Sequence, residues 1–320
     1  MRVLVVGGSG YLGQFVVQNL ERDERIASVA RTYHSSAPVG DDTREASTTA
    51  AVRVDLGATD AGACGFSRVE EIWGRPDVVI NCAAISQPRA CKEDPARARA
   101  INVPERLQDW LLALGTPAPL LVHLSTDHVY AGSQGPFYKE SDACDPVNEY
   151  GRSKVEAERF LLDGRYAQNV VILRSSMIYG PPPPTAPVSR ALFLQWMDGV
   201  LSRGEDVTFF EDEFRSPVFV DDVVAAIRAA MAAWSEGPGR IWPHPQERVF
   251  NVGGPQRMSR LEMARALSRM RGHGEPRGTP RPAAVDGPLD CSMDVTRLGE
   301  RLGVHPRTFE GALHAIFPSG

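Results

Sequence analysis

Long hydrophobic runs and clustered cysteines are both missing from this chain of 320 residues. A membrane-spanning helix needs roughly 20 apolar residues in succession, and no window approaches that number, so we expect no membrane partner. The five cysteines are scattered and have no CxxC spacing. This argues against a metal or redox site and favours a cytoplasmic protein with reduced thiols. The N-terminal residues lack a small-residue cleavage site, so we interpret them as a first strand and not as a signal peptide.

An excess of charge of one sign is also missing. The formal net charge is −5 at pH 7, and so modest a value gives no basis for binding nucleic acid. The length suits one large domain with a smaller one attached. These absences leave a cytoplasmic enzyme or binding protein.

The first half of the chain contains short apolar runs that alternate with longer helical patterns. The apolar runs are the expected strands, at residues 2–6, 27–32, 51–56, 77–84, 120–127 and 170–176. Helical patterns lie between them, at residues 11–23, 96–114 and 154–164. Near-continuous apolar strands separated by helices predict an α/β fold, a doubly wound parallel Rossmann sheet with helices on both faces.

Proline marks where the chain leaves this sheet. The run PPPPTAP follows Gly180, and a second polar stretch rich in glycine and proline covers residues 271–288. Both break regular structure. We therefore predict an NAD(P)-binding Rossmann domain at residues 1–180 and a smaller α/β substrate-binding lobe at residues 181–320. The two are expected to interleave in part, with the chain returning to the first domain around residues 217–253.

Three glycines, Gly7, Gly10 and Gly13, lie between the first expected strand and the first expected helix. In a dinucleotide-binding loop the first allows the tight turn, the second lets the backbone approach a pyrophosphate, and the third lets the helix pack on the strand. The helix N-terminus adds N–H donors and a partial positive charge. The spacing is one residue longer than GxGxxG, so the position directly after a strand is what predicts dinucleotide binding.

The end of the second strand decides which nicotinamide cofactor is expected. NAD sites usually carry an acidic residue there for the ribose hydroxyl, whereas an arginine accommodates the 2′-phosphate of NADP. The segment holds Arg31, Ser35 and Ser36 and no acidic residue. We therefore predict NADP(H) as the preferred cofactor, with NAD(H) as the other option. A solvated edge charge is the alternative interpretation of Arg31.

Two further segments are expected beside the cofactor. Asp55 and Leu56 end the third strand, where contacts with adenine are usual in such folds. Ala83 and Ala84 end the fourth strand, and small residues are needed where the backbone passes close to a cofactor. All four are predicted cofactor contacts.

Tyr150 and Lys154 lie four residues apart at the start of a charged helical pattern, so both side chains can face one ligand. An isolated phenol titrates near pH ~10, and a neighbouring ammonium favours the phenolate. Tyr150 can then donate a proton to a carbonyl oxygen as hydride reaches the carbon. Lys154 can orient the hydride donor through its ribose. The YxxxK pattern is common by chance, and one exposed helical turn is the alternative.

A hydroxyl pair, Ser125 and Thr126, ends the fifth strand at the sheet edge where ligands of open α/β folds bind. A hydroxyl there can hold the substrate oxygen beside Tyr150. Together with the glycine loop, this pair makes the YxxxK pattern a predicted site of carbonyl reduction.

The motifs GGSGYLGQ, LSTDHVYAG, EYGRSKVEAE and SPVFVDDVV, in this order, resemble the extended short-chain dehydrogenase/reductase family. Within it, the likeness is to the dTDP-4-dehydrorhamnose reductase group and covers almost the full length. It implies NAD(P)-dependent reduction of a 4-keto sugar nucleotide, a substrate pocket between the sheet edge and the C-terminal lobe, and often a homodimer. It also implies the catalytic triad Thr126, Tyr150 and Lys154. The implied cofactor contacts are Gly7, Gly10, Tyr11, Leu12, Gly13, Asp55, Leu56, Ala83 and Ala84.

The sequence departs from that group at positions on the substrate side. His128 replaces an aromatic residue, and Met177 replaces a tryptophan. The loop after the fourth strand carries Ser86, Gln87 and Arg89, which are expected to face the pocket. A structural role for His128 and simple packing for Met177 are the alternatives, and the identity of the sugar stays open. The predicted substrate contacts are Ser86, Thr126, His128 and Met177.

Arginine side chains can bind the phosphates of a nucleotide sugar. Arg190 and Arg215 are the candidates to meet a substrate pyrophosphate. Solvated arginines at the protein surface are the alternative for both.

Two other functions stay open. The β regulatory subunit of methionine adenosyltransferase is similar to the same group, and a protein of that kind binds NADP and acts through its methionine adenosyltransferase partner. An epimerase or dehydratase with the same triad would return the hydride to its substrate. The missing acidic residue on the second strand argues against the tightly held NAD of those enzymes.

Overall fold

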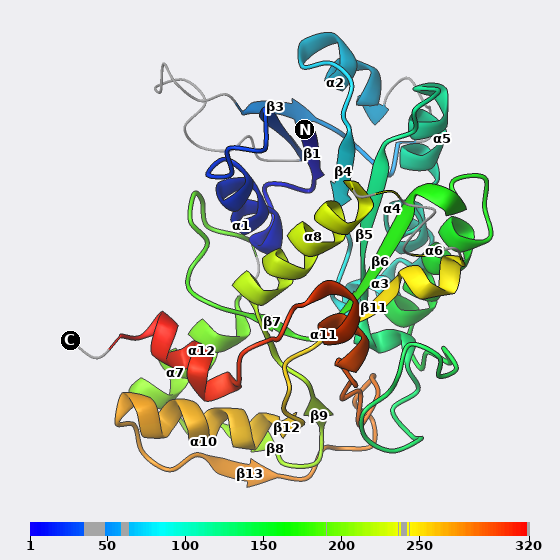
Figure 1. Cartoon of the computed structure of the whole chain (residues 1–320). Helices are drawn as coiled ribbons and strands as arrows, with labels where there is room; N and C mark the ends of the chain where they lie inside the picture. The colour runs from blue at the N-terminus through cyan, green and yellow to red at the C-terminus, as the bar shows by residue number, and fades with distance from the viewer. Residues whose placement is uncertain are drawn as a thin grey trace.

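A seven-stranded parallel sheet forms the centre of the computed structural model, which describes residues 1–34, 49–58, 64–189, 191–235, 237, 242 and 244–318. The strands lie in the order β11-β6-β5-β4-β1-β2-β3 (Figure 1). Their bounds are β1 (Arg2–Val6), β2 (Ser28–Tyr33), β3 (Ala50–Arg53), β4 (Val78–Asn81), β5 (Leu120–Thr126), β6 (Val170–Ser175) and β11 (Val249–Val252). The chain builds outward from β1 in one direction and from β4 in the other, which confirms the predicted doubly wound α/β fold.

The six strands predicted from apolar runs are all present. The predicted ends of β3 and β4 run too far, because the residues that follow Arg53 and Asn81 leave the ladder at the carboxyl edge of the sheet. The seventh strand, β11, was not predicted and pairs with β6 in parallel. The apolar run of β11 is short and contains a polar residue, Asn251, which weakens the strand signal. Asn251 Nδ2 donates to Tyr138 O at 2.8 Å, and Asn251 Oδ1 accepts from Tyr130 Oη at 2.7 Å.

Helices cover both faces of the sheet. Their bounds are α1 (Tyr11–Leu20), α2 (Phe66–Ile72), α3 (Pro88–Glu93), α4 (Pro95–Asn102), α5 (Glu105–Ala113), α6 (Glu149–Leu162), α7 (Phe193–Ser202), α8 (Val220–Ser235), α10 (Arg260–Arg271), α11 (Thr296–Leu302) and α12 (Phe309–Ile316). Successive strand residues point to opposite faces. On β1, Val3 and Val5 therefore belong to the core under α1 and α8, whereas Leu4 and Val6 belong to the core under α2, α5 and α6.

The long helix predicted for residues 96–114 is instead two helices, α4 and α5. Pro104 lies between them and lacks the N–H that would continue the ladder, and it disfavours the helical conformation at Val103. Val103 is extended, with φ −87° and ψ 113°. The chain therefore turns between the two helices, and α4 packs against α6.

The C-terminal part of the chain gathers beyond the carboxyl edge of the sheet, where Figure 1 shows α7, α10 and α12 beside three small sheets. Apolar residues of these helices, such as Met197, Leu267 and Leu313, continue the core that lies under α1 and α8. The division of the chain at residue 180 stays a prediction. The small strands are β7 (Ile178–Tyr179), β8 (Thr208–Phe210), β9 (Phe214–Arg215), β10 (Val218–Phe219), β12 (Met258–Ser259) and β13 (Arg277–Thr279).

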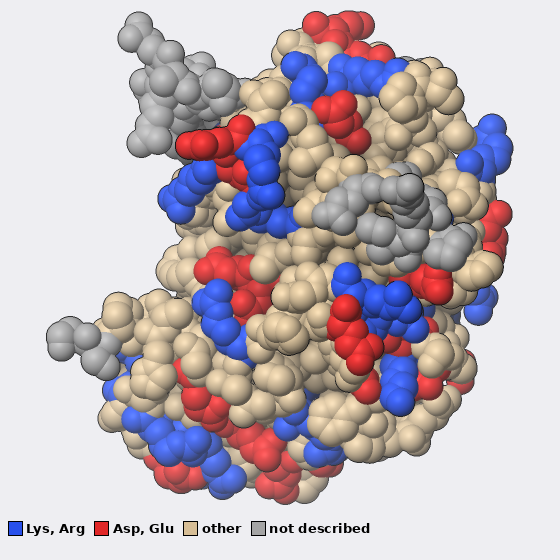
Figure 2. Space-filling model, in the orientation of Figure 1, with Lys and Arg blue, Asp and Glu red and all other residues tan. Residues whose placement is uncertain are grey.

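The described part of the chain holds no helix long and apolar enough to cross a membrane. Across the same residues, no three histidine, cysteine or acidic side chains are grouped so as to hold a metal ion. On the face drawn in Figure 2, basic and acidic side chains are interspersed.

Candidate active site

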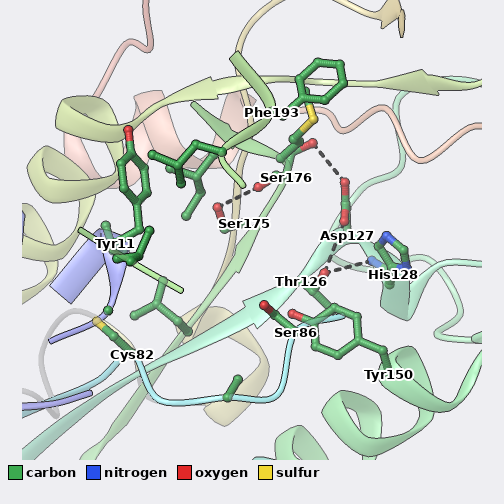
Figure 3. Close-up of a pocket in the computed structure, with 18 of the residues that line it drawn as sticks. Tyr11, Cys82, Ser86, Thr126, Asp127, His128, Tyr150, Ser175, Ser176 and Phe193 are labelled. Atoms are coloured by element: carbon green, nitrogen blue, oxygen red, sulfur yellow. Dashed lines mark hydrogen bonds between the residues drawn. The ribbon is translucent and has the colours of Figure 1, made fainter. Parts of the chain in front are cut away.

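A cavity of about 490 Å³ lies at the carboxyl edge of the main sheet and is walled on its far side by the C-terminal part of the chain (Figure 3). Ligands of open α/β folds bind at this edge. Many of the predicted site residues line the cavity. They are Gly10, Tyr11, Leu12, Gly13, Ala84, Ser86, Thr126, His128, Tyr150 and Met177.

The glycine loop is shaped by contacts that leave no room for side chains. Gly7 has a φ of +77°, in the left-handed region that favours glycine. A Cβ on Gly7 would lie 2.8 Å from the backbone N of Ala83, and one on Gly13 would lie 2.3 Å from the Gly7 carbonyl oxygen. Gly8 was not predicted but is equally restricted, because a Cβ there would lie 2.5 Å from Arg31 Cβ. Bare backbone and a helix N-terminus therefore meet here, as a dinucleotide pyrophosphate requires.

Gln14, on the first turn of α1, ties the glycine loop to the segment after β7. Its Nε2 donates to the carbonyl oxygens of Ser9 at 2.9 Å and Ala186 at 3.0 Å. Its Oε1 accepts from Thr185 N–H at 3.0 Å, from the Thr185 hydroxyl at 2.6 Å and from Ala186 N–H at 2.9 Å. Sequence analysis missed this residue, and its only signal was a polar side chain on the apolar face of the helix. Because Gln14 is 2% exposed, its hydrogen bonds are shielded from water and hold that segment over the cavity.

Arg31 lies on β2 beside the glycine loop, with its Cβ next to Gly8. Only 8% of the residue is exposed, so the interpretation as a solvated edge charge is wrong. Ser35 and Ser36, the other predicted features of this strand end, lie outside the described residues.

Asp55 and Leu56 follow β3, at the edge of the sheet beyond β2. The carboxylate Oδ1 of Asp55 accepts from Gly57 N–H at 3.0 Å and lies 3.6 Å from His34 Nε2. Leu56 is 9% exposed and packs in the core under α2. These residues therefore lie on the β2 and β3 side of the glycine loop, away from Tyr150.

Helix α6 carries Tyr150 in its first turn and Lys154 one turn later. The helix begins where Asn148 caps it, with Oδ1 accepting from Gly151 N–H at 2.8 Å. A Cβ on Gly151 would lie 2.2 Å from the carbonyl oxygen of His128. The missing side chain lets α6 approach the turn η2 (Asp127–Val129), and Tyr150 is thereby brought to the end of β5.

Tyr150 reaches the cavity from α6, while Thr126 and Ser86 reach it from β5 and from the loop after β4. Figure 3 shows the side chains of Ser86, Thr126 and Tyr150 on the wall of this cavity. Tyr150 is 9% exposed, so most of its ring is shielded from water. Three hydroxyl groups thus line the same cavity.

Asp127 orients the hydroxyl of Thr126. Thr126 Oγ1 donates to Asp127 Oδ1 at 3.1 Å and accepts from His128 N–H at 3.2 Å. The Ser176 hydroxyl donates to the other carboxylate oxygen at 2.9 Å, and Arg215 Nε lies 3.8 Å from it. A carboxylate as buried as this one, at 3% exposure, needs such partners. Asp127 is a part of the site that sequence analysis did not single out.

His128 is held in one tautomer by the cap residue of α6. Asn148 Nδ2 lies 3.0 Å from His128 Nδ1. The oxygen of this amide already accepts from Gly151 N–H, so its nitrogen donates to Nδ1 and the ring proton is on Nε2. Burial lowers the pKa of His128, an effect that Asp127 partly opposes. The ring is therefore neutral at neutral pH and has an N–H donor left on Nε2.

Lys154 is not among the residues that line the cavity. It is 1% exposed, and its Nζ lies 3.0 Å from His123 Nε2. Burial lowers the pKa of its amine to about 8, and Glu158 and Cys82 oppose this shift. The alternative of an exposed helical turn is therefore wrong for this pair. His123 was not predicted, although a histidine inside the apolar run LLVHLST was a visible signal.

Two predictions about the loop after β4 need correction. Arg89 is exposed, and its Nε donates to Glu93 at 2.8 Å. Gln87 is exposed as well, at the start of α3. Pro88 begins that helix directly after Gln87, which turns both side chains towards solvent and leaves Ser86 facing the cavity.

Of the two arginines expected on the substrate side, the structure describes one, Arg215. Arg215 lines the cavity, but it is 3% exposed and donates to the carbonyl oxygens of Phe214 at 2.7 Å and Pro288 at 3.0 Å. The alternative of a solvated surface charge is therefore wrong for Arg215. Arg190 lies outside the described residues.

A further arginine, Arg260, was not predicted and also lines the cavity. Its guanidinium contacts the sulfur of Met177 and pairs with Glu213 at 3.0 Å. It also lies over the ring of Phe193, with Cζ 4.8 Å from the centroid. Met177 thus packs against a cation and lines the cavity at the same time.

Comparison of the sequence with known families gives one full-length match: the family described as the RmlD substrate binding domain matches residues 1–319. The probable low-salt glycan biosynthesis reductase Agl14 of Haloferax volcanii is 32% identical over 219 residues, which cover 68% of this chain and 66% of that protein. The dTDP-4-dehydrorhamnose reductase of Streptomyces griseus is 30% identical over 257 residues, covering 79% and 71%. Methionine adenosyltransferase 2 subunit beta of Bos taurus is 25% identical over 240 residues, covering 73% and 67%.

Solved structures share the fold over nearly the whole chain. A hypothetical dTDP-4-dehydrorhamnose reductase from Sulfolobus tokodaii is 26% identical with a TM-score of 0.73, covering 97% of this chain and 99% of that one. The UDP-glucose 4-epimerase of Thermotoga maritima, solved with UDP-glucose, has a TM-score of 0.79 at 23% identity, covering 99% and 97%. The dTDP-4-dehydrorhamnose reductase of Bacillus anthracis, solved with NADP, has a TM-score of 0.75 at 20% identity, covering 99% and 97%. The last two likenesses show the fold alone.

Proposed function

We propose a function from the premise that the chain belongs to the RmlD substrate binding domain family, within the extended short-chain dehydrogenases/reductases. In this proposal the protein is an NADP(H)-dependent reductase of a carbonyl group, with a 4-keto sugar nucleotide as substrate. The main support is one juxtaposition. The glycine loop, Thr126 and Tyr150 line a single cavity, and Lys154 is buried one turn after Tyr150 on α6.

The cofactor side of the proposal rests on the cradle around Gly7 and Gly13, which a Cβ would fill. NADPH bound there would supply the hydride. The N-terminus of α1 and the bare loop backbone would hold its pyrophosphate. Arg31, next to Gly8, supports a preference for the 2′-phosphate of NADP(H) over NAD(H). Lys154 would hold the nicotinamide ribose, and Asp55 with Leu56 would bound the adenine.

The proton side of the proposal rests on the hydroxyl groups at the end of β5. Tyr150 would donate its phenolic proton to the carbonyl oxygen of the substrate as that oxygen gains charge. Ser86 would donate to the same oxygen. The single hydroxyl proton of Thr126 is directed at Asp127, so Thr126 would have to turn this proton towards the substrate in order to join it. Donors that face the oxygen stabilise the developing alkoxide.

The substrate class is supported by the polar groups opposite the glycine loop. His128 would donate from Nε2 to a sugar hydroxyl, and Met177 would pack against the ring. Arg260 and Arg215 line that wall. Although Glu213 and Asp127 balance their charge, guanidinium groups suit the phosphates of a nucleotide. Among the relatives, the Streptomyces griseus protein is named dTDP-4-dehydrorhamnose reductase.

The test is consumption of NADPH in the presence of a panel of nucleotide-linked 4-keto sugars, followed by the absorbance of the reduced nicotinamide. We expect turnover of at least one such sugar, with NADPH preferred over NADH. A matched panel of the corresponding 4-hydroxy sugars is the control and should give no NADPH consumption. Failure of every keto sugar, with NADPH shown to bind, would contradict the proposed reaction.

A second candidate is a regulatory subunit that binds NADP without turnover. It is favoured by the 25% identity to methionine adenosyltransferase 2 subunit beta. The two candidates differ in a measurable way, because a regulatory subunit would copurify with a methionine adenosyltransferase partner and alter its activity. An epimerase or dehydratase would instead keep its nicotinamide cofactor through dialysis and need no added NADPH.

A further inference from the structure

One buried side chain, Gln14, links the glycine loop to the segment that follows β7. Its Nε2 donates to the carbonyl oxygen of Ser9 in the glycine loop at 2.9 Å and to that of Ala186 at 3.0 Å. Its Oε1 accepts from Thr185 N–H at 3.0 Å, from the Thr185 hydroxyl at 2.6 Å and from Ala186 N–H at 2.9 Å. Turning this amide over would set its nitrogen against N–H groups and its oxygen against carbonyl oxygens. The partners of Gln14 therefore agree on one orientation.

Thr185 and Ala186 belong to residues 181–189, which we call the strap. Two other strap residues, Val188 and Ser189, line the same cavity as the glycine loop. The loop backbone and the N-terminus of α1 are where the proposed function places the pyrophosphate of the dinucleotide. The strap therefore encloses part of the cavity that the dinucleotide would occupy.

Hydrogen bonds from side chains, and not secondary structure, hold the strap in place. Five of its nine residues are prolines, which have no N–H to donate. With the other described residues the strap forms no backbone–backbone hydrogen bond. Two of its four backbone N–H groups donate to Gln14. Tyr11, three residues before Gln14 on the same face of α1, adds a bond from its Oη to Pro181 O at 2.9 Å.

We propose that Gln14 is a positioning residue that holds the strap over the bound dinucleotide and so limits the rate at which the cofactor leaves. This inference rests on the proposed binding of NADP(H) at the glycine loop. For the cofactor to leave, the strap must move away from α1, and the hydrogen bonds of Gln14 must break. A reductase exchanges NADP+ for NADPH in every turnover, so this opening is a step of the reaction cycle.

The two ends of this contact can be altered separately. Gln14 is 2% exposed, whereas Thr185 is exposed. A change at Thr185 therefore leaves the core under α1 intact, and groups of the strap that lose their partner can bond water. An effect of Thr185 on cofactor release that depends on Gln14 would thus not come from a general loss of stability.

The rate of cofactor release can be measured without a sugar substrate. Protein loaded with NADPH is mixed rapidly with an excess of NADP+, and the decay of nicotinamide fluorescence gives the dissociation rate constant. Gln14→Leu removes all the hydrogen bonds of the amide, and we expect it to raise this constant about tenfold. Gln108→Leu is the matched control, since Gln108 is also buried, at 3% exposure, but lies on α5. It should leave the constant within about twofold of its original value.

Thr185→Val removes one hydroxyl donor from the strap and keeps the shape of the side chain. We expect it to raise the dissociation rate constant about threefold in the unaltered protein. In Gln14→Leu, the same change should have no further effect, because the hydroxyl has already lost its acceptor. Such non-additivity shows that two residues act through one contact.

Two outcomes would overturn the inference. One is a dissociation rate constant that Gln14→Leu does not change, and the other is an equal effect of Thr185→Val with and without Gln14. If Gln14→Leu folds poorly, Thr185→Val alone decides, since unchanged release in that variant would contradict the proposed role of the strap. Protein that releases NADPH as expected but reduces no keto sugar would contradict the proposed reaction and leave this inference standing. Failure to bind NADPH would overturn the cofactor assignment and this inference together.

Discussion

The ring of His128 stands edge-on to the ring of Tyr150, with centroids 5.5 Å apart and an interplanar angle of 65°. The two rings come from opposite sides of the gap between η2 and α6, and Asn148 joins them by capping the helix and bonding the imidazole. His128 therefore has two separable parts, an aromatic surface that packs on Tyr150 and an Nε2–H donor.

His128→Phe keeps the aromatic surface and removes the donor. We expect KM for the sugar nucleotide to rise about tenfold, the value of one hydrogen bond of roughly 1.4 kcal/mol. We expect kcat and NADPH affinity to stay within about twofold. Steady-state kinetics with both substrates varied checks this. An unchanged KM together with a loss of stability would show that the histidine serves only the fold.

Gln14→Leu removes the hydrogen bonds that hold the segment around Thr185 over the cavity. We expect the backbone amides of Thr185 and Ala186 to lose protection from hydrogen exchange, and the free energy of unfolding to fall by about 1–3 kcal/mol. Gln108→Leu is the matched control, since Gln108 is also buried, at 3% exposure, but lies on α5. Equal effects of the two variants on Thr185 would refute the assignment.

Gly13→Ala adds a Cβ that would lie only 2.3 Å from the carbonyl oxygen of Gly7. The first turn of α1 must shift away from the loop, so we expect NADPH affinity to fall at least tenfold and stability to fall by about 1–3 kcal/mol. Gly274→Ala is the control, because a Cβ on Gly274 meets no atom within 4 Å. Isothermal titration calorimetry and urea unfolding measure the two effects. NADPH binding unchanged by Gly13→Ala would separate this loop from the cofactor.

Lys154 gives the protein a specific dependence of stability on pH. Its pKa is lowered from 10.5 to about 8 by burial, so the unfolded chain binds more protons than the folded protein between these values. The cost of this buried amine is therefore present below pH 8 and disappears as the pH rises towards 10.5, a change of roughly 3 kcal/mol. Lys154→Met removes it, so the unaltered protein should gain stability relative to that variant as pH rises from 7 to 10.5.

Urea unfolding across that pH range provides the measurement. Lys139→Met, at an exposed lysine, is the control and should show no such gain. A difference between the unaltered protein and Lys154→Met that stays constant with pH would show that Lys154 is not discharged by burial.

The sequence was sufficient for most of the scaffold, because parallel strands buried on both faces leave an unbroken apolar signal. β1 and β5 were predictable for that reason. The helical pattern predicted at residues 154–164 located α6, but the helix already begins at Glu149. β11 was not predictable, because its four residues, Val249–Val252, include a polar side chain whose partners lie far away in the chain. The break between α4 and α5 was visible as Pro104 but was overlooked in a long helical pattern.

In the candidate active site too, the sequence predicted residues that lie in local motifs and missed residues whose partners are distant in the chain. Gly7 and Tyr150 lie in motifs whose spacing has a local physical meaning, and these were identified. His123, Gln14 and Asp127 act through partners on other elements, at separations along the chain that no local pattern encodes. Arg89 was misplaced for a related reason, since the direction of a loop side chain depends on where the next helix begins. Burial of polar residues inside apolar runs was the one signal that pointed to His123 and Gln14.

The most direct test of the proposed reaction is Tyr150→Phe, assayed for reduction of a nucleotide-linked 4-keto sugar and for NADPH binding. The change removes one oxygen from a largely buried ring and leaves the glycine loop untouched. We predict that turnover falls by a factor of about 10²–10⁴, the usual contribution of a positioned acid, while NADPH affinity stays within about twofold. Turnover retained at the level of the unaltered protein would contradict the assignment of Tyr150 as the proton donor.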